Sequence, residues 1–313
     1  MKTLYVMDPL DRIDVEGDST YALLLDGSRR GWPQSWCTPG DLFVEGGRAH
    51  AHCAPISAHD DAPCLRSGEA VPLPLSDFDA VWMRKDPPFD KKYLFSTYIL
   101  DLAGPGTQVF NDPTSLKCAN EKMYALNWSH LCPPTLATNR VDEVRRFAQD
   151  FEAVVLKPWD GMAGKGVLLS AASDPNLNAM AEILTEGGTF CLVQRYIPEI
   201  AEGDKRIILV DGVARGWFSR IPGDQDHRGN MHVGARVVAC ELSDRDRLIC
   251  EEIGPRLKED GLLFVGIDVI GDFLTEINVT SPTGLREIER LQGRNLASEI
   301  LDCMEARRVQ KQA

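Results

Sequence analysis

The sequence predicts an α/β protein, and three observations support this class. The N-terminal third alternates strand-like and helix-like segments, the pattern of a parallel sheet with crossover helices. Beyond residue 153 the chain is rich in strand-like segments, several of them joined by glycine-containing turns. A length of 313 residues is sufficient for about two domains.

The N-terminal elements begin with the strand TLYVMDP and a helix that Asp18 or Ser19 caps and Gly31 ends. Two more strand-like segments, DAVWMRKDPP and TQVFNDP, enclose the helical segment YLFSTYILDLA. Residues 45–76 show weak periodicity, and we expect them to form a loop with short strands. A change of composition near residues 113–123 predicts the first domain boundary.

The remaining elements follow in a clear order. Helices are expected in NEKMYALNWS and RVDEVRRFAQDF. Strands follow in EAVVLKP, CLVQRYIP, KRIILVDG and VARGWFSRIP. The last helices are expected in DRDRLICEEIGPRLKEDG and in the C-terminal segment.

Composition restricts the functions that this chain can have. A formal net charge of −13 argues against nucleic acid or an anionic membrane as the main partner. Nine cysteines without a C-x-x-C pair are typical of reduced thiols in the cytosol. No segment approaches the ~20 apolar residues of a membrane span, and MKTLYVMDPL is too short an apolar run for a signal peptide. We therefore expect a cytoplasmic protein.

Residues 264–284, FVGIDVIGDFLTEINVTSPTG, predict a β-hairpin. A two-residue loop at Gly271-Asp272 would place the apolar residues of the two arms on opposite faces. A three-residue loop, 271–273, pairs Asp268 with Glu276 and gathers the apolar residues on one face. We favour this second register, in which one face carries three oxygen-bearing side chains, Asp268, Glu276 and Asn278.

Two carboxylates and an amide on one face repel each other unless a cation lies between them. Hard oxygen ligands in this number suit Mg²⁺, which usually also binds substrate phosphates and water. A solvated hairpin face is the alternative interpretation of the same charges.

A second candidate site is the segment 154–170, VVLKPWDGMAGKGVLLS, in which a glycine-rich loop joins two strand-like runs. Gly161, Gly164 and Gly166 allow backbone N–H groups to approach a phosphate, and Lys157 supplies positive charge. The spacing is not that of a P-loop, and a strand follows instead of a helix. By itself, a glycine-rich hairpin is weak support for a phosphate site and favours a flexible surface turn.

Further cations accompany these two segments, among them Lys122, Arg206 and Arg220. Arg228 and Arg236 flank a segment that is too long for a tight turn and predicts either an active-site lid or plain disorder. A glycine loop, a strand arginine and a carboxylate hairpin together suit binding of a Mg-nucleotide and neutralisation of a transferred phosphoryl group.

From Met7 to Glu289 the chain resembles the bacterial-type glutathione synthetases of the ATP-grasp superfamily. The resemblance is carried by MRKDPPFD, LKPWDGM, GDKRIILVDG, LLFVGID and TEINVTSPTG. It implies an ATP-grasp fold with an N-terminal parallel-sheet domain. The implied units are an N-terminal substrate domain at 1–120, a lid subdomain at 121–197 and a catalytic subdomain at 198–313.

The same resemblance implies a carboxylate–amine ligase that depends on ATP and Mg²⁺, with Mn²⁺ as a possible substitute. The enzyme would join γ-glutamylcysteine to glycine, giving glutathione, ADP and phosphate through an acyl phosphate. A cytoplasmic homotetramer is also implied.

Residue roles follow from the resemblance. The metal ligands would be Asp268, Glu276 and Asn278, and the side chains acting on the reacting groups Arg206, Arg220 and Asn278. The nucleotide would contact Lys122, Lys157, Gly161, Gly164, Gly166, Gln194, Tyr196, Ile197 and Asp204. Candidates for the γ-glutamyl end are Asp18, Ser19 and Arg84, and for the glycine side Ser281, Thr283, Arg220 and Arg228. The segment 222–237 would close over the site as a lid.

Two positions differ from the expected pattern, since Ala163 and Ala235 stand where a glycine is expected. The added bulk near the acceptor end leaves open a larger or different amino acid than glycine. An ATP-grasp ligase with another acceptor amine or another γ-glutamyl donor is the nearest enzymatic rival. A nucleotide-binding regulatory module without turnover is a rival from another class. The joint presence of the predicted metal ligands, Lys157 and Arg206 argues against this rival, because a module without turnover has no chemical need for all of them.

Overall fold

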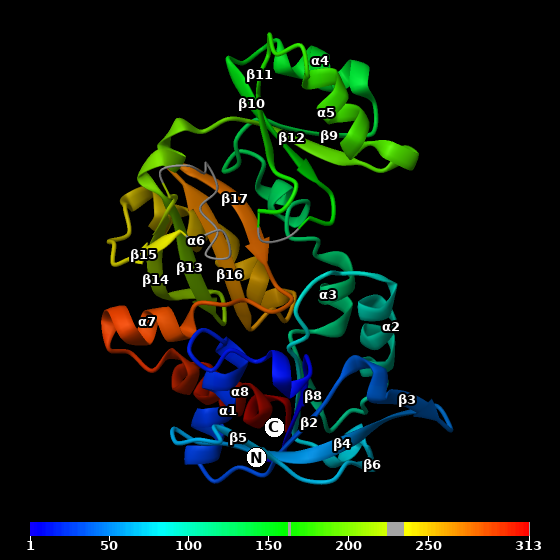
Figure 1. The fold of residues 1–313 in the computed structure, drawn as a ribbon. Helices are drawn as coiled ribbons and strands as arrows, with labels where there is room; N and C mark the ends of the chain where they lie inside the picture. Colours follow the sequence, from blue (N-terminus) through cyan, green and yellow to red (C-terminus); the bar gives the residue numbers. More distant parts are fainter. Residues whose placement is uncertain (162–163, 224–234, 313) are drawn as a thin grey trace.

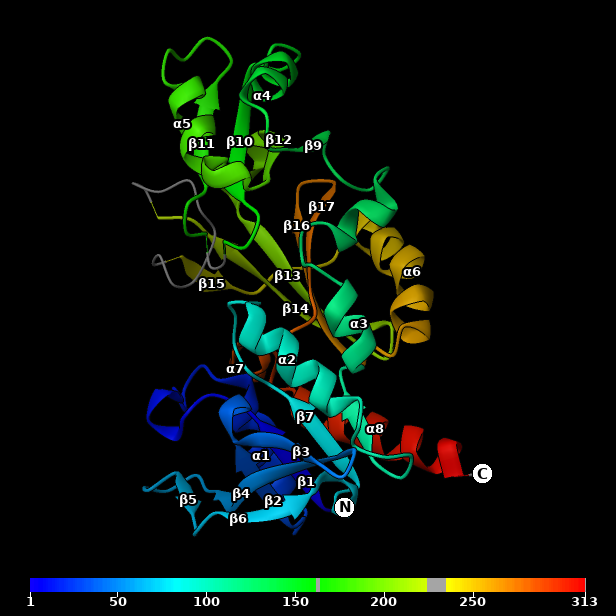
Figure 2. The ribbon, with the colours of Figure 1, turned by 90° about the vertical axis from the view of Figure 1, so that its right-hand side faces the viewer.

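The computed structural model describes residues 1–161, 164–223 and 235–312. Figures 1 and 2 show three β-sheets arranged along the long axis of the molecule, with helices beside each of them. This mixed α/β architecture agrees with the predicted fold class. In the described part of the chain, no helix is both long and apolar enough to cross a membrane.

The first sheet contains eight of the described strands, in the order β3-β4-β2-β1-β7-β8, with β5 and β6 paired to β4. Strands β1, β2, β7 and β8 run parallel, which confirms the predicted N-terminal parallel sheet. The strands are β1 (Thr3–Val6), β2 (Gln34–Cys37), β3 (Leu42–Glu45), β4 (Arg48–Ala58), β5 (Leu65–Ser67), β6 (Val71–Pro74), β7 (Ala80–Met83) and β8 (Gln108–Phe110).

The helices of this unit are α1 (Ser19–Arg29), α2 (Lys91–Leu100) and α3 (Pro113–Cys118). Asp18 caps α1, as predicted, because its carboxylate accepts hydrogen bonds from the backbone N–H groups of Thr20 and Tyr21 at 2.5 and 2.9 Å. Such a cap satisfies donors that have no partner within the helix.

The assignment of residues 45–76 as a loop with short strands is wrong for β4. This strand has 11 residues and pairs with β2, β3, β5 and β6. Its buried positions are mostly small, including Ala49, Ala51, Cys53 and Ala58. Small side chains give little hydrophobic contrast, so the alternation typical of a strand is weak in the sequence.

The second sheet contains four of the described strands, all antiparallel, in the order β11-β10-β12-β9. Its elements are β9 (Thr135–Thr138), β10 (Ala153–Pro158), β11 (Leu168–Ala171), β12 (Cys191–Arg195), α4 (Val141–Ala148) and α5 (Leu177–Leu184). The predicted strand–loop–strand unit is confirmed by the β10–β11 hairpin. The expected helix in NEKMYALNWS is reduced to a short 3-10 helix, Tyr124–Trp128.

The third sheet contains five of the described strands in the order β15-β14-β13-β16-β17. Its elements are β13 (Asp204–Val210), β14 (Val213–Ile221), β15 (Arg236–Val238), α6 (Asp244–Glu259), β16 (Phe264–Ile270), β17 (Phe273–Asn278), α7 (Leu285–Gln292) and α8 (Leu296–Gln312). Helix α8 returns to the first unit and lies beside α1 (Figure 1). Arg30 fixes this contact through Ser298 Oγ at 2.6 Å and Asp302 at 2.7 Å.

Candidate active site

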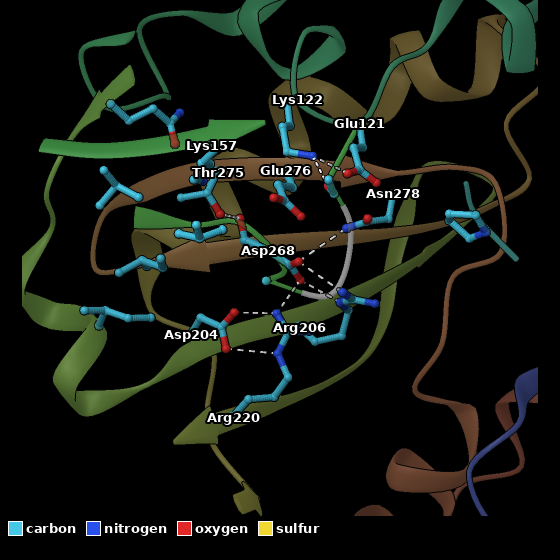
Figure 3. Close-up of a pocket in the computed structure, with 18 of the residues that line it drawn as sticks. Glu121, Lys122, Lys157, Asp204, Arg206, Arg220, Asp268, Thr275, Glu276 and Asn278 are labelled. Carbon is cyan, nitrogen blue, oxygen red and sulfur yellow. Dashed lines mark hydrogen bonds and ion pairs between the residues drawn. The ribbon is translucent and has the colours of Figure 1, made fainter. Parts of the chain in front are cut away.

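A cavity of about 260 Å³ lies between the second and third sheets. Strands β10 and β12 contribute one wall, and β13, β14, β16 and β17 contribute the other (Figure 3). The residues predicted from the sequence that line it are Lys122, Lys157, Gly161, Gly164, Gln194, Tyr196, Ile197, Asp204, Arg206, Arg220, Asp268, Glu276, Asn278, Ser281 and Thr283.

The β16–β17 hairpin has the expected pairing of Asp268 with Glu276, but its turn differs from the favoured one. The three-residue loop is wrong, because Ile270 pairs with Phe273 and leaves a two-residue turn. The register then shifts between Asp268 and Val269, where Thr275 is the extra residue of a β-bulge. The bulge produces the pairing that the three-residue loop was expected to produce. The four apolar residues of the two arms, Ile267, Val269, Ile277 and Val279, therefore share one core.

Asp268 lies in a buried cluster of four charged side chains. Its carboxylate accepts from Arg206 Nε at 2.6 Å and Nη2 at 3.0 Å, and pairs with Arg220 Nη2 at 2.8 Å. Burial alone would raise the pKa of Asp268, but the two guanidinium groups lower it to about 2. Asp204 pairs with Arg220, and burial raises the pKa of Asp204 to about 6, against the opposing effect of the Arg220 charge.

Glu276 faces two lysines on the opposite side of the cavity (Figure 3). Lys122 is buried and donates from Nζ to the Gly161 carbonyl at 2.6 Å. Burial opposes the charge of Lys122, but Glu276 and Glu121 outweigh this effect and raise its pKa. Desolvation lowers the pKa of Lys157, and the attraction of Glu276 offsets part of that shift. Within the described residues the side-chain carboxylate of Glu276 has no hydrogen bond or ion pair, although its backbone is paired in the β16–β17 ladder, so the carboxylate oxygens can accept a ligand.

The end of β12 and the residues that follow it line a further part of the cavity. Gln194, Arg195, Tyr196 and Ile197 line it in succession. The guanidinium of Arg195 lies over the ring of Phe273, 4.8 Å from its centroid, which connects the second sheet to the hairpin turn of the third.

The residues proposed for the substrates divide into two groups. Ser281 and Thr283 line the cavity, whereas Asp18, Ser19 and Arg84 do not, and Asp18 is occupied as a helix cap. Ser19 Oγ accepts from the backbone N–H groups of residues 284 and 285 at 3.1 and 3.2 Å, and Arg84 donates to the carbonyl of residue 282 at 3.0 Å. These two side chains therefore hold the segment that carries Ser281 and Thr283.

Four predictions concern positions at the margin of the site. Gly166 belongs to the β10–β11 loop, with φ of +76°, but does not line the cavity. Arg228 and Ala163 lie outside the described residues, as does most of the proposed lid at 222–237.

Glu121 and Thr275 are cavity residues that the sequence reasoning did not assign. Burial, followed by the charge of Glu276, raises the pKa of Glu121. Its carbonyl accepts from the N–H of Ile277 at 2.9 Å, which fixes it beside β17. Its position next to Lys122, itself a predicted phosphate contact, was the available signal in the sequence.

The fold and the cavity define an ATP-grasp ligase. Two solved structures share the fold over 98% of this chain. D-cycloserine synthetase has a TM-score of 0.68 and 13% identity, and the match covers 99% of that chain. D-alanyl-alanine synthetase A from Vibrio cholerae has a TM-score of 0.62 and 12% identity, and the match covers 98% of that chain. At such identities the likeness concerns the fold alone.

The sequence comparisons are more specific. The model of the prokaryotic glutathione synthetase N-terminal domain matches residues 1–117, and that of the prokaryotic glutathione synthetase ATP-grasp domain matches residues 121–293. Glutathione synthetase from Synechococcus elongatus is 44% identical over 98% of both chains, and that from Pseudomonas aeruginosa is 43% identical over 96% of both. The chain belongs to the prokaryotic glutathione synthetase family and is an ATP-dependent carboxylate–amine ligase of glutathione synthesis.

Proposed function

We propose that the cavity between the second and third sheets joins γ-glutamylcysteine to glycine through an acyl phosphate. The γ-phosphoryl group of ATP would pass to an oxygen of the cysteinyl carboxylate, giving ADP and the acyl phosphate. The amine of glycine would then attack the carbonyl carbon, and phosphate would leave with that oxygen while the amine loses a proton. The supporting observation is the convergence of two lysines, two arginines and the carboxylate hairpin on one cavity.

The residues present fit a divalent cation. Among the described residues no three His, Cys, Asp or Glu side chains gather as a metal site, and the donors here are two carboxylates, Asp268 and Glu276, with the Asn278 amide. Mg²⁺ commonly binds through one or two carboxylates together with substrate phosphates and water. We therefore assign Mg²⁺, with Mn²⁺ as a substitute, to these three side chains; when bound, it would neutralise phosphate charge.

The nucleotide would lie along the part of the cavity that carries Lys122 and Lys157. Lys122 and Lys157 face the cavity interior and carry the charge needed to hold the phosphates. Gly161 and Gly164 let the β10–β11 loop approach them closely, and residues 194–197 would border the adenine.

The acyl group would lie in the part of the cavity that carries Arg206 and Arg220. The guanidinium of Arg206 would face the charge that develops on the acyl phosphate and on the oxyanion formed by amine attack. Ser281 and Thr283 also line the cavity, the carbonyl of Thr283 accepts from Arg206 Nη1 at 3.3 Å, and both residues would contact the amino-acid substrates. No protein nucleophile is needed, because the activated carbonyl is made by phosphorylation.

Phosphate release from Mg-ATP with γ-glutamylcysteine, measured with and without glycine and with mass detection of the product, tests this function. Glycine-dependent release with glutathione formed is the expected result. Cysteinyl carboxylate labelled with ¹⁸O should deliver one labelled oxygen to phosphate. Release with only another amino acid would refute the choice of acceptor, and unlabelled phosphate would refute the acyl phosphate.

Three further predictions do not depend on the geometry of the cavity. The three units with boundaries near 120 and 197 would be tested by limited proteolysis, and the homotetramer by analytical ultracentrifugation. A cytoplasmic location is supported by nine free thiols and would be tested by cell fractionation.

A further inference from the structure

Strand register builds the buried ion cluster of the third sheet. Asp204 is opposite Arg220 across β13 and β14, and Arg206 is opposite Asp268 across β13 and β16. Since Asp204 and Arg206 are two residues apart on β13, they share one face of the sheet. Each of the four residues is at most 7% exposed, and Figure 3 shows them facing one another. The cluster is therefore a buried group of charges that strand pairing brings together, not a surface ion pair.

The carboxylate of Asp268 has no acceptor position to spare. Its Oδ1 receives Arg206 Nε at 2.6 Å and Arg220 Nη2 at 2.8 Å. Its Oδ2 receives Arg206 Nη2 at 3.0 Å and the Asn278 amide at 3.3 Å. An ionised carboxylate offers about four lone-pair positions, and four donors use them. A cation can bind Asp268 only if at least one of these donors leaves.

The two arginines differ in the ion-pair partners that remain to them when Asp268 moves away. Among the described residues, Asp268 is the one carboxylate that pairs with Arg206, whose other partner is the Thr283 carbonyl at 3.3 Å. Arg220 also donates Nε to Asp204 at 2.9 Å and Nη2 to the second oxygen of Asp204. Withdrawal of Asp268 would leave Arg220 anchored by a fork and Arg206 without an anionic partner.

We propose that Asp268 is transferred from the two arginines to the divalent cation, so that Arg206 is released toward an anionic group of the substrate while Asp204 keeps Arg220 in place. This inference rests on the proposed function, which supplies both the cation and the anion. Asp204 is then a positioning residue that acts through Arg220, a different role from the nucleotide contact implied by family resemblance. Cation and anion binding favour each other in this arrangement, because each removes a competitor of the other.

A double-mutant cycle tests the role of Asp204, with calorimetric binding of Mn·ADP as the readout. Asp204→Asn should weaken Mn·ADP binding at least about fivefold, because Arg220 then depends on Asp268 alone and competes more strongly with the cation. In an Arg220→Met background the same change should alter binding by less than about twofold. Equal losses in both backgrounds would mean that Asp204 acts directly on the nucleotide or cation, and would overturn the proposal.

Arg206→Lys gives a second measurement that does not depend on the folding of Arg220→Met. Lysine keeps the positive charge but cannot donate to both oxygens of Asp268, so one acceptor position becomes free. Binding of Mn·ADP should become tighter by about fivefold. Unchanged or weaker binding would overturn the transfer, because a cluster acting only through its net charge predicts no gain.

Glu276→Gln separates this inference from the proposed function. Wild-type protein that binds no Mn·ADP would overturn both. Wild-type binding that is lost in Glu276→Gln, together with equal effects of Asp204→Asn in the two backgrounds, would overturn the transfer alone. Circular dichroism and thermal unfolding of each variant identify losses that come from misfolding.

Discussion

Asp268 and Glu276 stand opposite each other on β16 and β17 although only two residues form the turn between these strands. Thr275 makes this possible as the extra residue of a bulge, with its side chain donating to the Asp268 carbonyl at 3.0 Å. A regular two-residue hairpin would oppose Asp268 to Thr275 and turn the oxygen ligands of the two strands to opposite faces. The bulge therefore creates the carboxylate face of the cavity.

Thr275→Val tests the contribution of the bulge hydroxyl to stability. The substitution preserves the shape of the side chain but removes a buried donor and leaves the Asp268 carbonyl without it. We expect the free energy of unfolding to fall by about 1 kcal/mol. Urea unfolding measures this change, and Thr114→Val at an exposed position of α3 is the control. A loss in the free energy of unfolding equal to that of the control would show that the Thr275 hydroxyl does not stabilise the bulge.

Glu276→Gln tests the metal site by activity. The change preserves volume but removes a negative charge from the cavity, so kcat/KM should fall at least about 100-fold without loss of the folded state. Glutathione formation at limiting Mg²⁺ is the measurement. The exposed Glu202→Gln is the matched control and should retain full activity. Normal activity of Glu276→Gln would refute the assignment of this carboxylate.

Arg206→Lys tests electrostatic catalysis. Lysine supplies a charge but not the planar fork, so kcat should fall by about 10²-fold without a comparable rise in the KM for ATP. Steady-state kinetics with ATP and γ-glutamylcysteine measure both constants, and exposed Arg145→Lys on α4 is the control. An unchanged kcat would exclude Arg206 from the chemical step.

Local pattern was sufficient to predict much of the site. Alternation within residues 264–284 predicted the hairpin and the pairing of Asp268 with Glu276, because both depend on neighbours in the sequence. Glycines and a lysine between two apolar runs predicted the β10–β11 loop for the same reason. The compensating bulge was missed, since a three-residue loop and a two-residue turn followed by a bulge satisfy the same apolar pattern, and the choice between them depends on local backbone geometry.

Contacts between distant segments could not be predicted in this way. The pairing of Arg206 with Asp268 depends on which strands become neighbours in the third sheet, and these residues are 62 positions apart. Ser19 and Arg84 were assigned to substrate by resemblance, whereas in the structure they hold the segment after β17 from the first unit. A sequence shows the polar side chain but not the backbone group that it reaches across a domain contact.

Asp211→Asn tests a pH-dependent contribution to stability. Burial raises the pKa of Asp211, but Lys258 at 2.9 Å and Arg307 outweigh this effect, so its pKa is lowered. A lowered pKa stabilises the fold above the unfolded value of about 4, and this stabilisation is lost as pH falls through the folded pKa.

At pH 7 Asp211→Asn should therefore cost about 1 kcal/mol, and the difference from wild type should shrink below about pH 4. Asparagine tolerates the positive φ of 52° at this position, so backbone strain does not confuse the comparison. Urea unfolding across this pH range measures the effect, with exposed Asp61→Asn as control. A difference that is constant with pH would show that the charge of Asp211 is not responsible.

Gly254→Ala tests the close approach of α6 to the β13–β14 turn. Alanine favours a helix over glycine by about 1 kcal/mol, so propensity alone predicts a more stable protein. A β-carbon at position 254, however, would lie 2.2 Å from the carbonyl oxygen of Gly212, a backbone atom that cannot move aside without shifting the turn. We expect steric strain to prevail, with a loss of at least about 2 kcal/mol in the free energy of unfolding. Gly106→Ala, which meets no atom within 4 Å, is the control and should be close to neutral. A stabilised Gly254→Ala would show that the helix and the turn are farther apart than this packing requires.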